Sequence, residues 1–407
     1  MLVNEKALLV SLDGDSLKEI QELAYTAGAV VCEQVSQHLK RITPTYFMGE
    51  GKAKEIAQKV SEQGIQVVLI DEDLSPAQQN NLEELCGVKV IDRTGLILDI
   101  FAQRAQSQAG KLQVELAQLN YLLPRLTGHG VAMSRLGGGI GTRGPGETKL
   151  EYDRRKIRDR ISVLKKELKN LKITRDMHRQ KRQGVPLPIV TIVGYTNAGK
   201  STLLNTLTAS HVLAEDKLFA TLDPTTRKLI LPNHQKILLT DTVGFIKKLP
   251  VQLVEAFKAT LEEVTEADVL LHVIDISQPN FEDQAREVLK ILHELGVSKT
   301  PTLHVYNKID ACPKDQHVFL TRQRFHPFCV ISAEQKIGLD VLLTKVQDLL
   351  THFTEVIEVK LPMEDQKILS QIYSEGQVLE KKYLKNSIRI KASVSHKLAN
   401  RLKQLYS

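Results

Sequence analysis

The sequence predicts an α/β protein with four parts, and three patterns support this prediction. Short β-rich runs alternate with helical stretches over residues 1–105, leucine and isoleucine heptads occur within 106–183, and apolar strands that end in polar motifs follow over 184–353. Such alternation is typical of parallel sheets covered by helices. We expect an N-terminal parallel α/β domain, an antiparallel helical hairpin, a second α/β domain and, over 354–407, a small basic α+β domain.

Composition excludes several classes of protein. The chain has 407 residues, of which 42% are hydrophobic and 25% charged, and it contains no apolar run of 18 residues. A transmembrane helix is therefore not expected, and the N-terminus lacks the layout of a signal peptide. The cysteines stand far apart without a CxxC pair, so neither a disulfide framework nor a zinc site is indicated. We expect a cytoplasmic protein without integral membrane contact. The cysteines are Cys32, Cys86, Cys312 and Cys329.

The N-terminal domain is expected to have four strands, in the runs 7–12, 29–35, 67–70 and 88–91. An acidic cluster, Asp71 to Asp73, follows the third run, where it could cap the next helix. The domain contains no phosphate loop. Its sequence therefore predicts a fold but no chemistry.

The hairpin is predicted from two apolar repeats with the 4, 3, 4 spacing of paired helices, over 111–123 and 157–171. Between them, residues 124–150 hold 8 of the 23 glycines, which predicts a long loop at the hairpin tip. This loop contains a GxGxxG, but no strand precedes it, so a dinucleotide fold is not expected. The basic residues of the loop are Arg125, His129, Arg135 and Arg143.

Charge is unevenly distributed along the chain. The net charge is +7, yet residues 149–182 alone carry 14 Lys and Arg against 5 Asp and Glu. A second excess lies in 381–407, with 8 basic residues and no acid. One such run is commonly a solvated helix face. Two runs flanking one domain favour a polyanionic partner such as RNA.

The second α/β domain begins with a nucleotide-binding signature. The apolar run 189–194 leads into GYTNAGKS at 194–201 and then into a helical stretch, which is the strand, GxxxxGK[ST], helix context of a phosphate loop. The backbone N–H groups of such a loop surround the phosphates, Lys200 reaches the β and γ oxygens, and the Ser201 hydroxyl binds Mg²⁺. A second strand ends in Asp241-Thr-Val-Gly244, where a carboxylate can hold Mg²⁺ through water and a glycine N–H can meet the γ-phosphate.

A third strand end predicts the base that is bound. Asn307, Lys308 and Asp310 follow the apolar run 303–306. Guanine presents two adjacent N–H donors that a carboxylate accepts, whereas adenine has an acceptor there. Asp310 thus selects GTP over ATP. Val330 to Glu334 fits the loop that closes over the base.

The first switch must supply a threonine for Mg²⁺ between residues 205 and 240. Thr221, Thr225 and Thr226 all qualify on chemistry. Phe245 stands directly after Gly244, where many GTPases have a glutamine that orients the attacking water. Phenylalanine cannot bind water, so we expect slow hydrolysis that a partner accelerates.

The C-terminal domain is expected to contain a strand at 356–361, a helix at 363–380, a strand at 387–394 and a helix at 396–406. Together these elements form a basic α+β appendage.

These motifs, together with SRLGGGIGTRGPGETKLE at 134–151, resemble those of the HflX family of translation-factor-related GTPases over at least residues 1–350. The 134–151 segment is the most distinctive. The resemblance implies a cytoplasmic GTPase that binds the large ribosomal subunit, reaches toward the peptidyl transferase centre with its N-terminal region and splits stalled or idle ribosomes. It also implies that Thr221 is the threonine linked to Mg²⁺. Asn197 resembles the asparagine of potassium-activated relatives, which adds K⁺ as a possible cofactor.

Two classes of function follow from this. The first is a monomeric ribosome-bound GTPase acting in splitting, rescue or subunit biogenesis, with hairpin and N-terminal region on ribosomal RNA. The alternative is a regulatory GTPase switch that acts on a protein or membrane partner. In either class Lys200, Thr221 and Gly244 are expected to be catalytic, and Ser201 and Thr221 to bind the metal. The residues expected to contact GTP or GDP are Gly194, Tyr195, Thr196, Asn197, Ala198, Gly199, Lys200, Ser201, Phe219, Ala220, Thr221, Leu222, Asp223, Asp241, Thr242, Val243, Gly244, Asn307, Lys308, Ile309, Asp310, Ser332, Ala333 and Glu334.

Overall fold

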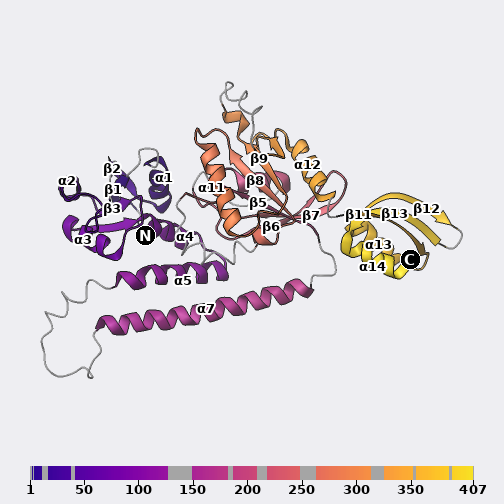
Figure 1. Ribbon diagram of the computed structural model, residues 1–407, viewed down its shortest axis with the longest axis horizontal. Coiled ribbons are helices and arrows are strands. Elements are labelled where there is room, and N and C mark those ends of the chain that lie inside the picture. Colours follow the sequence, from indigo (N-terminus) through magenta and orange to yellow (C-terminus); the bar gives the residue numbers. More distant parts are fainter. Residues whose placement is uncertain are drawn as a thin grey trace. The chain divides into compact units, whose positions relative to one another are not determined.

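The fold was analysed in a computed structural model of the chain (Figure 1). The chain forms two compact units. The first comprises Met1–Thr174, Asp216–Leu222 and Lys248–Lys258, and the second comprises Arg175–Glu215, Asp223–Lys247 and Ala259–Ser407. The structure describes residues 2, 4–11, 17–37, 42–126, 149–181, 187–208, 218–247, 263–312, 325–351, 354–384 and 387–406. Most of the predicted tip loop, with His129, Arg135 and Arg143, lies outside these residues.

The N-terminal sheet is parallel, as predicted, and its strand order is β2-β1-β3-β4. Its inner strands are almost wholly apolar and buried on both faces because helices cover both. Helices α1 and α4 contact each other, as do α2 and α3, which places one pair on each side. The elements are β1 (Lys6–Ser11), α1 (Leu17–Ala27), β2 (Val30–Ser36), α2 (Glu50–Gln63), β3 (Val67–Ile70), α3 (Pro76–Cys86), β4 (Lys89–Asp92) and α4 (Arg93–Arg104).

The acidic cluster after β3 does not cap the following helix, contrary to the expectation. Ser75 caps α3 in a capping box with Gln78, and this helix has its proline at the first turn. Asp71 instead pairs with the buried guanidinium of Arg93. The acid therefore fixes the start of α4, because an unpaired buried charge would be costly.

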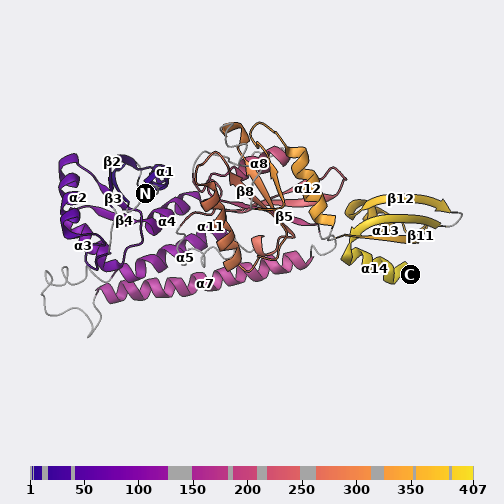
Figure 2. The same cartoon turned by 45° about the horizontal axis from the view of Figure 1, so that its top comes forward.

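The helical hairpin is present, and its two helices run side by side (Figures 1 and 2). Helix α5 spans Gln108–Arg125 and α7 spans Lys149–Lys181. Leu116, Ile161 and Leu164 are buried between them, and Arg160 pairs with Glu115 across the seam. The predicted heptads thus form the contact between the helices. Both helices extend beyond the repeats, since no helix-breaking residue stops α7 before Lys181.

The second α/β domain has a six-stranded sheet of order β10-β9-β8-β5-β7-β6, with only β6 antiparallel. Strand β5 lies between β7 and β8, so the chain leaves it toward one side and later returns on the other. Ligands bind at such a switch point, beyond the carboxyl ends of the strands. The elements are β5 (Ile189–Gly194), α8 (Lys200–Thr208), β6 (Thr225–Ile230), β7 (Lys236–Asp241), β8 (Val269–Asp275), α11 (Phe281–Glu294), β9 (Thr302–Asn307), the 3₁₀ turn η2 (Ile309–Ala311), β10 (Phe328–Val330) and α12 (Leu339–Thr351).

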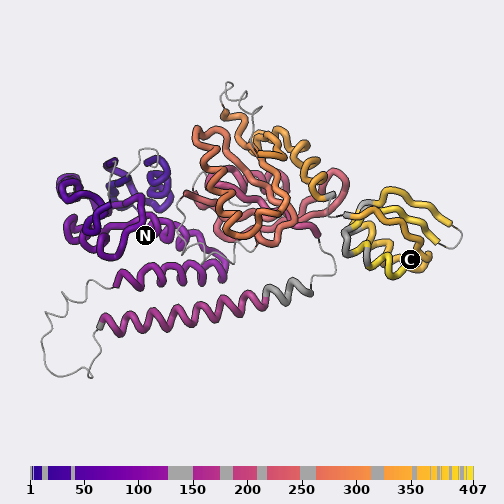
Figure 3. Tube along the Cα trace, in the orientation of Figure 1, coloured from indigo at the N-terminus to yellow at the C-terminus, as the bar shows by residue number. Residues whose placement is uncertain are grey.

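The C-terminal domain is a three-stranded antiparallel sheet, ordered β11-β13-β12, with two helices that share its core, and it appears in yellow at the chain end in Figure 3. The prediction of one helix over 363–380 was wrong. Helix α13 ends before Gly376, and the edge strand β12 follows. The elements are β11 (Thr354–Pro362), α13 (Gln366–Glu375), β12 (Gln377–Leu384), β13 (Ser387–Ser395) and α14 (His396–Tyr406).

No helix among the described residues has both the length and the hydropathy to cross a bilayer.

Candidate nucleotide-binding site

The phosphate loop connects the end of β5 to the start of α8, as the sequence predicts. Gly194 lies so close to β8 that a Cβ atom would be 2.3 Å from the Val273 carbonyl oxygen. Gly199 has φ +90°, and its Cβ would be 2.3 Å from Asn307 Nδ2. Both positions therefore require glycine. Because these two residues carry no side chain, the loop packs directly against β8 and Asn307.

Lys200 is buried at the first turn of α8. Its Nζ donates to the Tyr195 carbonyl oxygen at 2.7 Å, which holds the amine against the loop. Burial lowers the pKa of Lys200 to about 8, while the nearby carboxylate of Asp241 opposes that shift. A phosphate would bring negative charge to this amine and favour its protonated form.

Ser201 and Asp241 form the polar pair expected for Mg²⁺. The Ser201 hydroxyl donates to Asp241 Oδ2 at 2.6 Å, joining the start of α8 to the end of β7. Asp241 itself is fully buried. Hydroxyl and carboxylate oxygens are the hard donors that Mg²⁺ prefers, so these residues fit that ion.

The DTVG segment is fastened to the phosphate loop by its backbone. Phe245 N–H donates to the Gly194 carbonyl at 3.0 Å, and Thr196 N–H donates to the Phe245 carbonyl at 2.7 Å. A Cβ on Gly244 would be 2.8 Å from Thr196 Cα and 3.0 Å from Lys200 Nζ. Only glycine fits there. The Phe245 side chain is buried, in agreement with its inability to position water.

Further links hold this segment in place. The Tyr195 hydroxyl accepts from Lys247 N–H at 2.8 Å, and Thr242 donates to the Ile192 carbonyl at 2.7 Å. The side chain of Val243, which follows Thr242, is buried. The phosphate loop and the DTVG segment thus form one connected structure.

The first two residues of the NKID motif connect the loops around them. Asn307 Nδ2 donates to the Ala198 carbonyl, and Asn307 Oδ1 accepts from Ala333 N–H, both at 2.9 Å. Asn307 therefore joins the phosphate loop to the 332–334 loop. Lys308 has φ +65° and pairs with Asp275 at 2.8 Å.

The remaining residues of the motif leave a carboxylate accessible. Ile309 and Asp310 begin the turn η2, and the Asp310 side chain is exposed. Ser332 is buried and receives a hydrogen bond from Gln335 N–H at 3.0 Å, which closes a tight loop. Ala333 is buried beside it, whereas Glu334 is exposed.

The first-switch candidates are separated by the structure. Thr225 and Thr226 lie in β6, and the Thr226 hydroxyl is 3.0 Å from that of Thr240, so both belong to the sheet. Thr221 lies outside any strand. It belongs, with Phe219, Ala220 and Leu222, to the first compact unit, whereas Asp223 belongs to the second. Phe219 packs edge-on against Phe101 of α4, with the ring centres 4.7 Å apart.

Sequence reasoning missed two features of this sheet. Asp275 ends β8 at the same edge as Asn307, and a search of every parallel strand end for acids would have found it. His272 and His304 form a buried pair with their Nδ1 atoms 3.1 Å apart. Burial lowers the pKa of His272 to about 3 and that of His304 to about 4, so both are neutral near pH 7. No pattern along the chain indicates this pair, because its members are on different strands.

Comparison with known proteins agrees with this geometry. The family models "GTP-binding GTPase N-terminal" and "GTP-binding GTPase Middle Region" match residues 14–102 and 104–182. The model "50S ribosome-binding GTPase" matches residues 189–308. The chain is 48% identical to the GTPase HflX of Caldanaerobacter subterraneus subsp. tengcongensis over 98% of this chain and 93% of that protein. It is 43% identical to the GTPase HflX of Escherichia coli K12 over 93% of this chain and 91% of that protein. With the phosphate loop, the DTVG segment and the NKID turn arranged at one sheet edge, these likenesses show that the chain belongs to the HflX family of GTPases.

Proposed function

We propose that this GTPase acts on the large ribosomal subunit, in ribosome splitting or rescue or in subunit biogenesis. The observation that carries the proposal is the match of the nucleotide domain to the 50S ribosome-binding GTPase model. The four-part division of the chain, at 1–105, 106–183, 184–353 and 354–407, is part of this proposal. The GTPase acts as a cytoplasmic monomer.

The exposed face of α7 supports an RNA partner. Helix α7 buries Ile161 and Leu164 against α5 and turns a different face to solvent. That exposed face is strongly basic, as an RNA backbone requires. Its exposed basic side chains are Arg155, Lys156, Arg158, Arg160, Lys165, Lys166, Lys169 and Lys172. The hairpin, its tip loop and the N-terminal domain would form the ribosomal contact.

We assign the site residues on the same basis. Lys200 would neutralise the β and γ phosphates, Ser201 and Thr221 would bind Mg²⁺, and Asp241 would hold that ion through water from the end of β7. Bound Mg²⁺ would supply charge stabilisation at the phosphates. The Gly244 N–H would meet the γ-phosphate, and the Asp310 carboxylate would accept hydrogen bonds from guanine.

Potassium is the proposed second cation. Asn197 lies in the phosphate loop with φ +59°, and we infer that its amide oxygen would bind this cation. Since buried Phe245 cannot position water, an added cation would offset part of the developing charge. Equal GTP turnover in potassium and in sodium, with and without ribosomes, would rule out this role.

Co-sedimentation with 50S subunits over a salt series tests the ribosomal role. The wild type should co-sediment with 50S subunits in the presence of a GTP analogue. The double variant Lys165→Glu, Lys166→Glu should bind them more weakly at every salt concentration. Each lost phosphate contact should make the log–log salt slope shallower by about one. Lys290→Glu with Lys299→Glu, an equal charge change at exposed positions of the GTPase domain, is the matched control.

The alternative function is a switch acting on a protein or membrane partner. The same hairpin variant would then bind 50S subunits as the wild type does. Normal co-sedimentation of the variant, or none by the wild type at low salt, would contradict the ribosomal proposal.

A further inference from the structure

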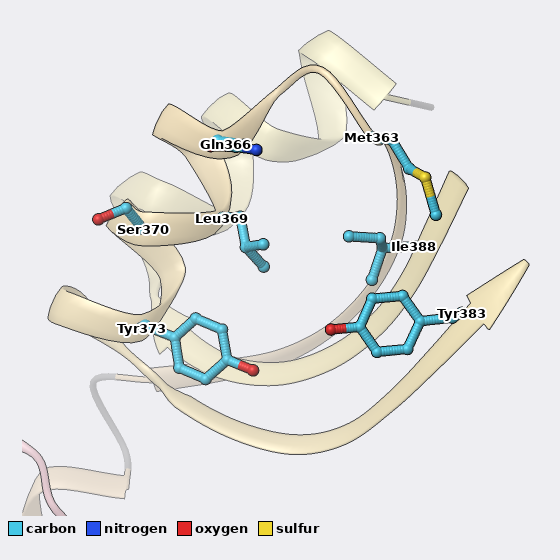
Figure 4. Close-up of a pocket in the computed structure, with 7 residues that line it drawn as sticks. All are labelled: Met363, Gln366, Leu369, Ser370, Tyr373, Tyr383 and Ile388. Carbon is cyan, nitrogen blue, oxygen red and sulfur yellow. The ribbon is translucent and has the colours of Figure 1, made fainter. Parts of the chain in front are cut away.

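The C-terminal domain contains an open surface cavity of about 600 Å³ between α13 and the strands β12 and β13. Leu369 and Ile388 line its apolar interior, and the hydroxyl ends of Tyr373 and Tyr383 point toward each other across it (Figure 4). The volume lies in the range of small-ligand sites. The GTPase motifs lie in another sheet, so the nucleotide site accounts for none of these residues.

The cavity exists because the edge strand β12 is only partly covered. Tyr383 is paired with Ile388 in the sheet and Lys381 with Ile390, and both isoleucines belong to the buried core. Tyr383 and Lys381 therefore lie on the face of the sheet that the helices cover. Even so, Tyr383 is 67% exposed and Tyr373, on α13, is 52% exposed. Two large aromatic side chains are thus left open to a partner.

The charge beside these rings indicates what that partner is. Lys381 Nζ lies 4.6 Å from the centre of the Tyr383 ring and 5.4 Å from that of Tyr373, within the range of cation–π contacts. From this lysine to the chain end there are eight basic residues and no acid. Three of them, Lys382, Arg389 and Lys403, form ion pairs with Glu380, Glu358 and Glu355, whereas Lys381 lies against the two rings. Cores of protein–protein interfaces are depleted in lysine. Aromatic rings beside a cation suit a flat base attached to a phosphate.

We propose that this cavity binds an unpaired base of single-stranded RNA. The base stacks on Tyr373 or Tyr383, Lys381 meets the adjoining phosphate, and Gln366 at the rim offers its amide to the base edge. Recognition of this kind is typical of RNA, because its loops expose unstacked bases. Only the identification of that RNA as ribosomal rests on the proposed function.

The experiment measures binding of the full chain to fluorescently labelled oligouridine by anisotropy, beside an abasic ribose-phosphate strand of equal length. The wild type should bind oligouridine about fivefold or more tightly than the abasic strand, as expected for one stacked base. Tyr383→Leu and Tyr373→Leu should each reduce that preference, whereas Lys381→Ala should weaken binding to both strands. Tyr25→Leu, at a tyrosine that is also 67% exposed but lies in α1, is the matched control.

Several results would overturn the proposal. The first is equal affinity of the wild type for the two strands. The second is an unchanged preference for oligouridine in both tyrosine variants. The third is a loss of that preference in Tyr25→Leu as large as in the tyrosine variants of the cavity. Thermal melting of each variant verifies folding, and the exposure of both tyrosines predicts unchanged melting. If Tyr383→Leu lowers 50S binding while the wild type shows no base preference, the cavity docks a protein and the RNA proposal fails. If the wild type prefers oligouridine but does not co-sediment with 50S subunits, the ribosomal function fails and this proposal stands.

Discussion

The chain contains two parallel sheets whose carboxyl edges differ in one respect. At the edge of the N-terminal sheet the described ion pairs lie within the fold: Arg93 pairs with Asp71 and Glu19, and Arg125 pairs with Asp92. At the edge of the GTPase sheet the phosphate loop brings glycines and the buried amine of Lys200 together. Similar architecture thus gives a closed, self-paired edge in one case and a phosphate site in the other.

The difference teaches that polar residues at strand ends do not by themselves make a site. Asp92 caps α4 through Gly95 N–H and also accepts from the hydroxyl of Tyr121 at 2.7 Å. Burial raises the pKa of Asp92, and the Gly95 and Tyr121 hydrogen bonds oppose that rise. Such internally satisfied groups stabilise a fold. In the GTPase sheet, Gly194, Gly199 and Gly244 instead let the phosphate loop and the DTVG segment pack closely against neighbouring backbone and side chains.

The largest expected effect breaks the closed edge. Arg93→Ala should destabilise the N-terminal domain by about 3–5 kcal/mol, because two carboxylates lose their buried partner. GTP affinity of the remaining folded protein should not change. Thermal melting and GTP titration measure the two effects. Arg286→Ala removes two exposed ion pairs and should cost at most about 1 kcal/mol, so equal losses in the two variants would contradict the comparison.

The second effect fills the open edge. Gly244→Ala should lower GTP hydrolysis by about 10²- to 10³-fold, the usual cost of a displaced backbone donor, because its Cβ would clash with Thr196. Single-turnover hydrolysis with radiolabelled GTP measures it. Gly51→Ala, where a Cβ meets nothing within 4 Å, should leave the rate unchanged. A normal rate for Gly244→Ala would show that the close approach has no catalytic role.

The third effect concerns base selection at the open edge. Asp310→Asn should weaken GTP binding by roughly 10- to 100-fold, since a charged hydrogen-bond acceptor is lost. It should improve binding of xanthosine triphosphate, because the amide can donate to the oxygen that replaces the guanine amino group. Competition with a fluorescent GTP analogue reports both changes. Unchanged GTP affinity in this variant would contradict the assignment of Asp310 to guanine binding.

The last effect is a pH dependence in the GTPase domain. His272 and His304 are neutral in the folded chain down to about pH 4, whereas unfolded histidine takes up a proton near pH 6.5. Unfolding therefore takes up protons as pH falls below about 6.5, and the free energy of unfolding drops by at most about 1.4 kcal/mol per pH unit for each histidine. Urea denaturation at pH 7, 6 and 5 measures the slope. A His272→Leu, His304→Phe variant should show a shallower slope, and an unchanged slope would contradict this assignment.

Most of the fold could be predicted because buried parallel strands leave a continuous apolar signature, as in β3 and β8. Strand β12 could not, since a solvent-facing edge strand with the sequence QVLEKKYL also resembles a helix. Arg125 shows a second limit. The sequence placed it in the tip loop, but it ends α5 and donates hydrogen bonds to Asp92 and to the Leu74 carbonyl, which are distant in sequence. The Ser201–Asp241 pair was predictable because each residue belongs to a recognisable motif: Ser201 to the phosphate loop at the start of α8, and Asp241 to the DTVG segment at the end of β7. The double role of Asn307 was not, because its partners lie in two other loops.

The most direct test of the contrast between the two edges is the stoichiometry of GTP binding by titration calorimetry. The account predicts one GTP per full chain with Mg²⁺ present, and no measurable GTP binding by Lys200→Ala, because the N-terminal edge is filled by its own ion pairs. A second GTP per chain, or GTP still bound by folded Lys200→Ala, would contradict the assignment of binding to the GTPase sheet alone.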